Sequence, residues 1–229
     1  MENRNILCQT DPQAQLETVL ALAAQHGNIP HCRRLLAAGA DIHEENELAL
    51  QLAAKHGQTK TCEFLLKNGA DISAQSHIAF RLATTHSKLE TAEFLLNQGA
   101  DIHAENDYAL TQAALAGLTE VCRFLLKHGA NPHVENDQAF RYAAAYGYTE
   151  ICKLFIDIGV DLHADNDFAL RWAGNTNKTE TCLFLIQKTK NLSRILKNPE
   201  MAKCVILLVR YEQNRRAAKH IRKTKSLEL

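Results

Sequence analysis

Histidine and carboxylate side chains recur at fixed positions along this chain, and both types can hold metal ions or carry protons. Of the 11 histidines, four occupy the same position of a repeated phrase: His43, His103, His133 and His163. Ser73 takes this position in one copy. Successive copies of a stacked helix lie about 8–10 Å apart. That spacing is too wide for a shared zinc ion, whose bonds to nitrogen are about 2 Å long. The pattern indicates hydrogen bonds that pack a turn, and we expect no metal site.

Acidic residues form columns of the same kind. They are Asp41, Asp71, Asp101 and Asp161, followed by Glu105, Glu135 and Asp165. Paired carboxylates carry acid–base chemistry when they meet in a cleft. Periodic columns on exposed turns are more simply helix caps and a solvated acidic edge. The chain contains no phosphate-binding loop, nucleophile elbow or zinc-protease motif. We therefore expect no catalytic residue, no cofactor and no enzyme.

Cysteines recur as well, but they indicate packing. Five of the seven share one position, Cys32, Cys62, Cys122, Cys152 and Cys182, and Ala92 stands there in the remaining copy. A position that accepts alanine is small and buried. Disulfide partners need Cα atoms within about 7 Å, closer than neighbouring helices approach. The column predicts reduced core cysteines.

These columns arise from a repeat of about 30 residues. The phrase "DIHAENDYAL" at 101–110 returns with variations at 41, 71, 131 and 161. Each unit contains an Asp-rich turn, a short helix rich in alanine, a breaker such as Gly117, a second amphipathic helix and another breaker such as Gly129. Two breakers per period predict two helices per period. Since no unit can bury its apolar face alone, the units must stack into an all-α solenoid.

The second half of each unit resembles the ankyrin repeat. The segments "GLTEVCRFLLKHGANPH" at 117–133 and "GQTKTCEFLLKNGADIS" at 57–73 are similar to the family's "GHLEVVKLLLxxGADVN". The resemblance covers about residues 12–190, or six helix pairs. It implies an ankyrin-repeat solenoid and a protein-binding function.

The unit departs from the family in its first half. Ankyrin repeats usually run about 33 residues and open with T-P-L-H, whereas "YALT" or "QAFR" stands here. The three missing residues fall at the tip of the family's β-hairpin, so we expect shortened turns. We also expect pairs such as Asn106 and Asp107 to cap the first helix. Short units of this kind are similar to ankyrin arrays of giant viruses of amoebae and of bacteria that live inside amoebae.

The repeat divides the chain into three predicted parts. Residues 1–11 are an N-terminal extension, 12–190 are six ankyrin-like repeats, and 191–229 are a C-terminal helical cap with a basic tail. Pro199 fits the first turn of a helix. Cys204, Val205, Leu207 and Leu208 are expected to cover the open end of the stack.

Variable positions point to a binding surface, because they are free from packing constraints. In ankyrin-like stacks the variable positions of the first helix lie on or near the concave face. Aromatic and arginine side chains, which are enriched in interface hot spots, gather there in the later units. The predicted partner-binding residues are Tyr108, Arg141, Tyr142, Tyr146, Phe168, Arg171 and Trp172. The alternative for each is that it fills space between helices.

The basic tail has three open interpretations. The chain is neutral overall, but residues 190–229 carry 11 lysines and arginines against 3 acids. The tail residues singled out are Arg210, Arg215, Arg216, Lys219, Arg222 and Lys223. They could bind nucleic acid or an anionic membrane, target the nucleus, or form a solvated helix end.

The function predicted from sequence is a protein–protein interaction module that binds its partner on the concave face. The amoeba resemblance implies an effector that targets a host protein. The alternative is a nucleic-acid or membrane adaptor led by the tail. With no secretory signal and no apolar run near the roughly 20 residues of a membrane span, we expect a cytoplasmic monomer. The amoeba resemblance also allows delivery into a host cell, and the basic tail also allows entry into the nucleus.

Overall fold

Helices are the regular elements of this protein. The computed structural model describes residues 12–189, 192–197 and 199–225, and no strand occurs among them. The chain divides into two units, Met1–Ala109 and Leu110–Leu229, and the division falls within one helix. The all-helical fold and the shortened turns predicted from the short period are thus confirmed for the described part of the chain.

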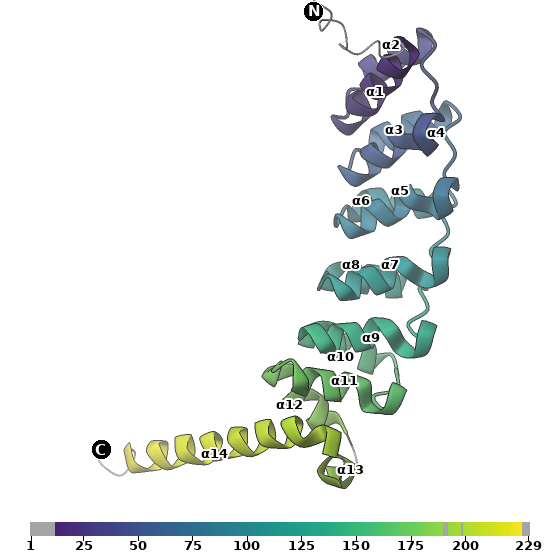
Figure 1. Cartoon of the computed structure of the whole chain (residues 1–229). Coiled ribbons are helices and arrows are strands. Elements are labelled where there is room, and N and C mark those ends of the chain that lie inside the picture. Colours follow the sequence, from purple (N-terminus) through teal and green to yellow (C-terminus); the bar gives the residue numbers. More distant parts are fainter. Residues whose placement is uncertain (1–11, 190–191, 198, 226–229) are drawn as a thin grey trace, which may run out of the picture. The chain divides into compact units, whose positions relative to one another are not determined.

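The first unit consists of antiparallel helix pairs. Its helices are α1 (Pro12–Gln25), α2 (Ile29–Ala37), α3 (Glu44–Lys55), α4 (Thr59–Lys67), α5 (Ala74–Thr85) and α6 (Leu89–Asn97). Helix α3 packs on α1 on one side and on α5 on the other, while α4 packs on α6 (Figure 1). The first helices therefore stack on first helices, and the second helices on second helices. Helix α7 (Ala104–Leu115) contains the boundary between the units.

The second unit has the same kind of internal arrangement and adds a cap. Its helices are α8 (Thr119–Lys127), α9 (Val134–Tyr146), α10 (Thr149–Asp157), α11 (Ala164–Asn175), α12 (Thr179–Lys188), α13 (Leu192–Lys197), a 3-10 helix at Pro199–Met201, and α14 (Ala202–Lys225). Helix α9 packs on α11, and α10 packs on both α8 and α12. Helix α14 lies against α11 and α12, at the end of the stack.

The small residues of the repeat form the core, as predicted. The alanines of the first helices are buried at Ala49, Ala79, Ala109, Ala139 and Ala169. The cysteines Cys32, Cys62, Cys122, Cys152 and Cys182 are free and fully buried, and so is Ala92 at the same position. Burial raises the pKa of the Cys62, Cys122 and Cys152 thiols to about 12. These thiols are packing groups.

The start of the first helix differs from the prediction in α3, α5, α7, α9 and α11. Asn106 and Asp107 do not lie ahead of a right-handed helix as ordinary caps. With Glu105 they adopt φ values of 52–56°, which makes one left-handed turn before the right-handed helix begins at Tyr108. The same three positions are left-handed in α3, α5, α9 and α11. Asparagine and aspartate tolerate this conformation better than most other side chains, which suits the second and third positions of "END".

The predicted C-terminal cap is present. The thiol of Cys204 is buried and donates to the carbonyl oxygen of Leu170 at 3.1 Å. Val205, Leu207 and Leu208 are half-buried. A Cβ added at Gly174 would overlap the Sγ of Cys204 and lie 3.3 Å from its backbone nitrogen. Earlier repeats have alanine or threonine at this position, for example Ala144, so glycine marks where α14 approaches instead of another repeat.

No helix in the described ranges combines the length and the apolar character that crossing a membrane requires.

Candidate functional site

Four of the five Asp-rich turns at residues 41–167 are held by one aspartate or asparagine and one histidine–carboxylate pair. In the fourth repeat the backbone N–H of His103 donates to Asp101 Oδ1 at 2.8 Å. His103 Nδ1 then meets the carboxylate of Asp107 at 3.0 Å, across the left-handed turn. The same pair recurs as His43–Glu47, His133–Asp137 and His163–Asp167. The predicted role of the histidines in turn packing is thus confirmed for these four.

The carboxylates of these pairs are nearly buried, whereas the imidazoles are largely or partly exposed. Asp137 also accepts a hydrogen bond from the backbone N–H of Asp161 in the next repeat, at 3.2 Å. The hydrogen bond to Glu47, together with its negative charge, raises the pKa of His43. Among the described residues, no group of three histidine, cysteine or acidic side chains could hold a metal ion. The hydrogen bonds of these turns stabilise the fold.

The third repeat uses a variant of this turn. Ser73 replaces the histidine, and its hydroxyl donates to Asp71 Oδ1 at 2.7 Å. Its backbone N–H donates to the same oxygen at 2.8 Å. Both bonds favour the ionised carboxylate, so they lower the pKa of Asp71. His77 stands where the other repeats have the acidic partner, so neither member of the histidine–carboxylate pair is present in this turn.

Two arginines of the variable columns link successive repeats. Arg141 donates to Asp165 Oδ2 at 2.6 Å and to the carbonyl oxygen of Glu135 at 2.9 Å. Its guanidinium also lies over the ring of Phe168, 5.0 Å from the centroid. Both Asp165 and Phe168 belong to the next repeat. Arg141 is thereby held in place by three neighbours, and its side chain is only 15% exposed.

The first unit contains an equivalent link. Arg81 donates to Glu105 Oε2 at 2.5 Å and to the carbonyl oxygen of Gln75 at 3.1 Å. Its guanidinium lies 5.3 Å from the centre of the Tyr108 ring. The separation along the chain between arginine and acid is the same as in the second unit. The arginine column therefore joins neighbouring repeats in both units.

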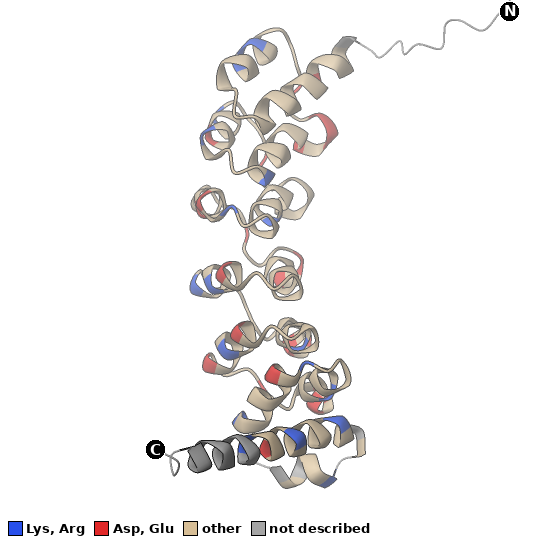
Figure 2. Ribbon diagram, turned by 90° about the vertical axis from the view of Figure 1, so that its left-hand side faces the viewer, with Lys and Arg blue, Asp and Glu red and all other residues tan. Residues whose placement is uncertain are grey.

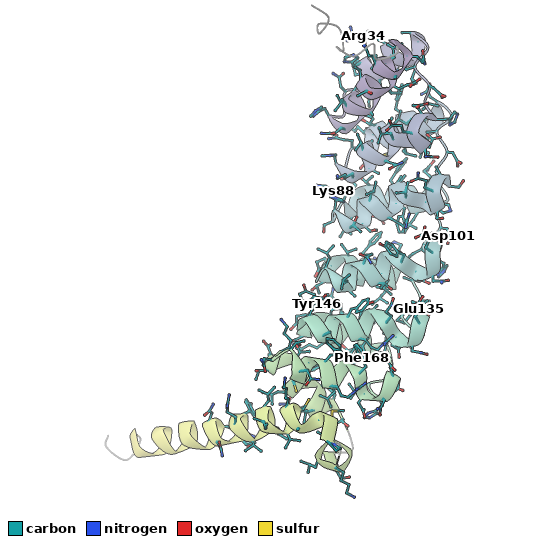
Figure 3. The ribbon with its side chains drawn as sticks, in the orientation of Figure 1. Arg34, Lys88, Asp101, Glu135, Tyr146 and Phe168 are labelled. Carbon is teal, nitrogen blue, oxygen red and sulfur yellow. The ribbon has the colours of Figure 1, made fainter. Side chains whose placement is uncertain are left out.

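The aromatic side chains of α9 and α11 surround an open hollow. Its volume is about 530 Å³, and it is lined by Tyr142, Ala145, Tyr146, Phe168, Trp172, Thr176 and Lys178. Phe168 and Trp172 stack with their ring centres 5.4 Å apart. Tyr146 is 52% exposed and Trp172 is 45% exposed. Figure 3 shows Tyr146 at one end of α9, Glu135 at the opposite end, and Phe168 on α11 beside them. We call Tyr142, Tyr146, Phe168 and Trp172 the aromatic surface.

The structure brings four of the seven residues singled out in the sequence together around the hollow, at positions 142, 146, 168 and 172 of two adjacent first helices. A fifth, Arg141, contacts this surface at the Phe168 ring. Arg171 is adjacent to Trp172 in the chain, and its Nη2 donates to the carbonyl oxygen of Asp165 at 3.5 Å. Tyr108 lies in the first unit beneath Arg81. That these residues contact a partner stays a prediction.

Sequence reasoning missed Ala145, Thr176 and Lys178, which also line the hollow. Ala145 is buried at the C-terminal end of α9, and Lys178 lies in the loop before α12. The aliphatic part of Lys178 folds over Gly147, since a Cβ there would be 2.7 Å from Lys178 Cδ. One sequence signal could have identified Lys178, namely that its loop position varies between repeats. The residues at this position are Gln58, Lys88, Leu118, Tyr148 and Lys178.

The basic tail is described only in part. Arg210 and Arg215 are exposed on α14, and Arg215 lies 3.3 Å from Glu212. Lysine and arginine residues occur at intervals along the described part of this helix (Figure 2). The side chains of Arg216, Lys219, Arg222 and Lys223 lie outside the described residues.

Comparisons with known proteins agree with the repeat. The family model described as "Ankyrin repeats (3 copies)" matches residues 3–76 and 110–195, which is more than half of the chain. A comparison with curated proteins finds no match. Ankyrin arrays generally serve as protein-interaction modules and non-enzymatic scaffolds. The predicted fold class, an all-α solenoid of ankyrin repeats with shortened turns, is confirmed. The chain belongs to the ankyrin-repeat family.

Proposed function

We propose that this protein is a scaffold that binds one partner protein through the aromatic surface of its second unit, without covalent chemistry. The observation that supports this proposal is the open hollow of about 530 Å³ between α9 and α11. Binding pockets generally measure about 300–1,000 Å³ and are mainly apolar, with a few polar groups. Tyrosine and tryptophan are the residues most enriched at binding hot spots.

Exposure of these rings argues for a partner. Large apolar side chains on a soluble surface are normally scattered, whereas Tyr146 and Trp172 belong to one hollow. Buried side chains such as Phe140 and Leu170 contribute to the core at α9 and α11. The exposed parts of Tyr146 and Trp172 are therefore not used in core packing. In the setting that the amoeba resemblance implies, the partner is a protein of the host cell.

The test uses affinity capture from cell lysate with the full chain, a Tyr142→Ala/Trp172→Ala variant and an Arg210→Gln/Arg215→Gln variant. Washing at about 50 and 300 mM salt separates binding through apolar contacts, which resists salt, from binding of the basic tail to phosphate groups, which salt weakens. A captured protein is identified by mass spectrometry, purified, and titrated against the three proteins. We expect the aromatic variant to lose at least about tenfold in affinity. Equal affinity of all three proteins would contradict the proposal.

A second candidate function rests on α14. Ile206 is 57% exposed and Val209 is 49% exposed, and both lie within one turn of the exposed Arg210. Apolar side chains next to cations suit the surface of an anionic membrane. Cosedimentation with vesicles of phosphatidylcholine, with and without phosphatidylserine, tests this candidate. Binding that needs phosphatidylserine and is lost in Ile206→Ser/Val209→Ser would support the adaptor function. Binding to DNA that falls steeply with salt would support a nucleic-acid adaptor instead.

A further inference from the structure

We infer that the aromatic surface selects an acidic peptide segment that carries a large apolar anchor residue. The inference rests on the proposed function and specifies the chemistry of the partner. It follows from the groups that line the hollow and from the charges at its edge.

The walls of the hollow are carbon-rich. Tyr142, Tyr146, Phe168 and Trp172 present rings to it, and Ala145 adds a methyl group. Two kinds of ligand suit aromatic walls. One is an apolar side chain, which loses contact with water on binding. The other is a cation, which is attracted to the negative face of a ring.

The charges at the hollow exclude the cation. The Arg141 guanidinium already lies over the Phe168 ring, 5.0 Å from its centroid. The lining includes Lys178 but no aspartate or glutamate. The carboxylate of Asp165, on the same helix as Phe168, is engaged by Arg141 at 2.6 Å. A cationic ligand would meet like charge without a compensating acid, so an apolar anchor is the ligand that fits.

Charge complementarity then assigns the residues that flank the anchor. Lys178 is half-buried, and its aliphatic part lies over Gly147 at the edge of the hollow. A carboxylate next to the anchor would pair with this ammonium group. Pairs at the edge of an interface chiefly set specificity and the rate of association. We therefore expect acidic residues beside the anchor to strengthen binding without being essential for it.

The experiment is a selection from a displayed library of random peptides without tryptophan, carried out on the full-length chain. Trp172 is the only tryptophan, so its emission reports directly on the hollow. Selected peptides are synthesised and titrated, and a shift of Trp172 emission to shorter wavelength marks binding there. Affinities are compared for the wild type, Lys178→Gln, Lys178→Glu and the control Lys127→Glu, whose exposed lysine lies on α8. Glutamine occurs naturally at the equivalent Gln58, so Lys178→Gln tests charge loss in a fold that tolerates it.

The expected result is a set of peptides with a Phe, Leu, Ile or Met anchor and neighbouring Asp or Glu. Lys178→Glu should weaken them about three- to tenfold, Lys178→Gln should weaken them less, and Lys127→Glu should have no effect. Peptides that shift Trp172 emission but carry neutral or basic flanks, or that ignore the charge of Lys178, would overturn the inference and leave the proposed function intact. If no selected peptide shifts Trp172 emission, the inference fails, and the proposed function is decided separately by the capture experiment with the Tyr142→Ala/Trp172→Ala variant.

Discussion

The guanidinium of Arg141 lies 2.6 Å from the carboxylate of Asp165, which belongs to the next repeat. The same guanidinium lies over Phe168, one of the four rings of the aromatic surface. One side chain thus joins two repeats and fixes a wall of the candidate site. The link between the two repeats and the geometry of the candidate site therefore depend on the same side chain.

Removing this link should destabilise the second unit. Arg141→Ala loses a charge-assisted hydrogen bond, the bond to the Glu135 carbonyl and the contact with Phe168. We expect the free energy of unfolding to fall by about 1–3 kcal/mol. Urea unfolding followed by circular dichroism measures this change. Arg123→Ala is the matched control, because its pair with Glu120 is longer, at 3.6 Å, and exposed. Equal effects of the two substitutions would rule out a special role for Arg141.

Gly174→Ala should destabilise the cap although alanine is the better helix former. Alanine is favoured over glycine within a helix by about 1 kcal/mol. At Gly174, however, the new methyl group would overlap the thiol of Cys204. We expect a net loss of about 1–3 kcal/mol in the free energy of unfolding. Asn175→Ala, at the exposed neighbouring position, should cause no such loss. A stabilising effect of Gly174→Ala would show that α14 does not pack closely here.

The His43–Glu47 pair predicts a pH dependence. Glu47 raises the pKa of His43 above its ordinary value of 6.5. The stabilisation from protonated His43 is therefore complete below about pH 6.5 and is lost as pH rises through the raised pKa. NMR titration of the His43 ring should give a pKa above 6.5 in the wild type and a lower one in Glu47→Gln. The free energy of unfolding should decline less steeply above about pH 6.5 in Glu47→Gln. Identical titration curves for the two proteins would contradict the assignment.

The buried cysteines should resist alkylation in the folded protein. With a pKa of about 12 for the Cys62, Cys122 and Cys152 thiols, only about one in ten thousand is ionised at pH 8. Iodoacetamide treatment followed by peptide mapping should leave these three unmodified without denaturant and modified fully in urea. The urea sample is the control for reagent activity. Rapid labelling of the folded protein would show that the repeats open locally.

Sequence alone predicted the helix pairs and the core well, because glycine breakers and apolar spacing act locally. It did not predict the left-handed turns. Residues such as Asn106 and Asp107 suit both a helix cap and a left-handed backbone, and local preference alone does not separate the two. The hydrogen bond from His103 to Asp107, formed only in the folded turn, favours the left-handed form.

The candidate site was predicted in part for a similar reason. Tyr142 and Trp172 occupy one column of the repeat, so their proximity follows from its regular period. The internal role of Arg141 does not follow from that column, since its partners Asp165 and Phe168 come from the next unit. Lys178 was missed because the prediction rested on variable positions of the first helices, whereas Lys178 lies in the loop before α12. For the candidate site, the contacts that could not be predicted from the sequence are therefore those between side chains of neighbouring repeats.

The close approach of Cys204 to Gly174 also decides where the array could gain new copies. A duplicated unit placed between existing ones would bring its own His–carboxylate turn and alanine column, and so would meet neighbours of matching chemistry. A unit added after α12 would instead replace Cys204 with a first helix, and the glycine would leave a gap there. We therefore expect an added unit to pack less well at the C-terminal end of the array than between existing units.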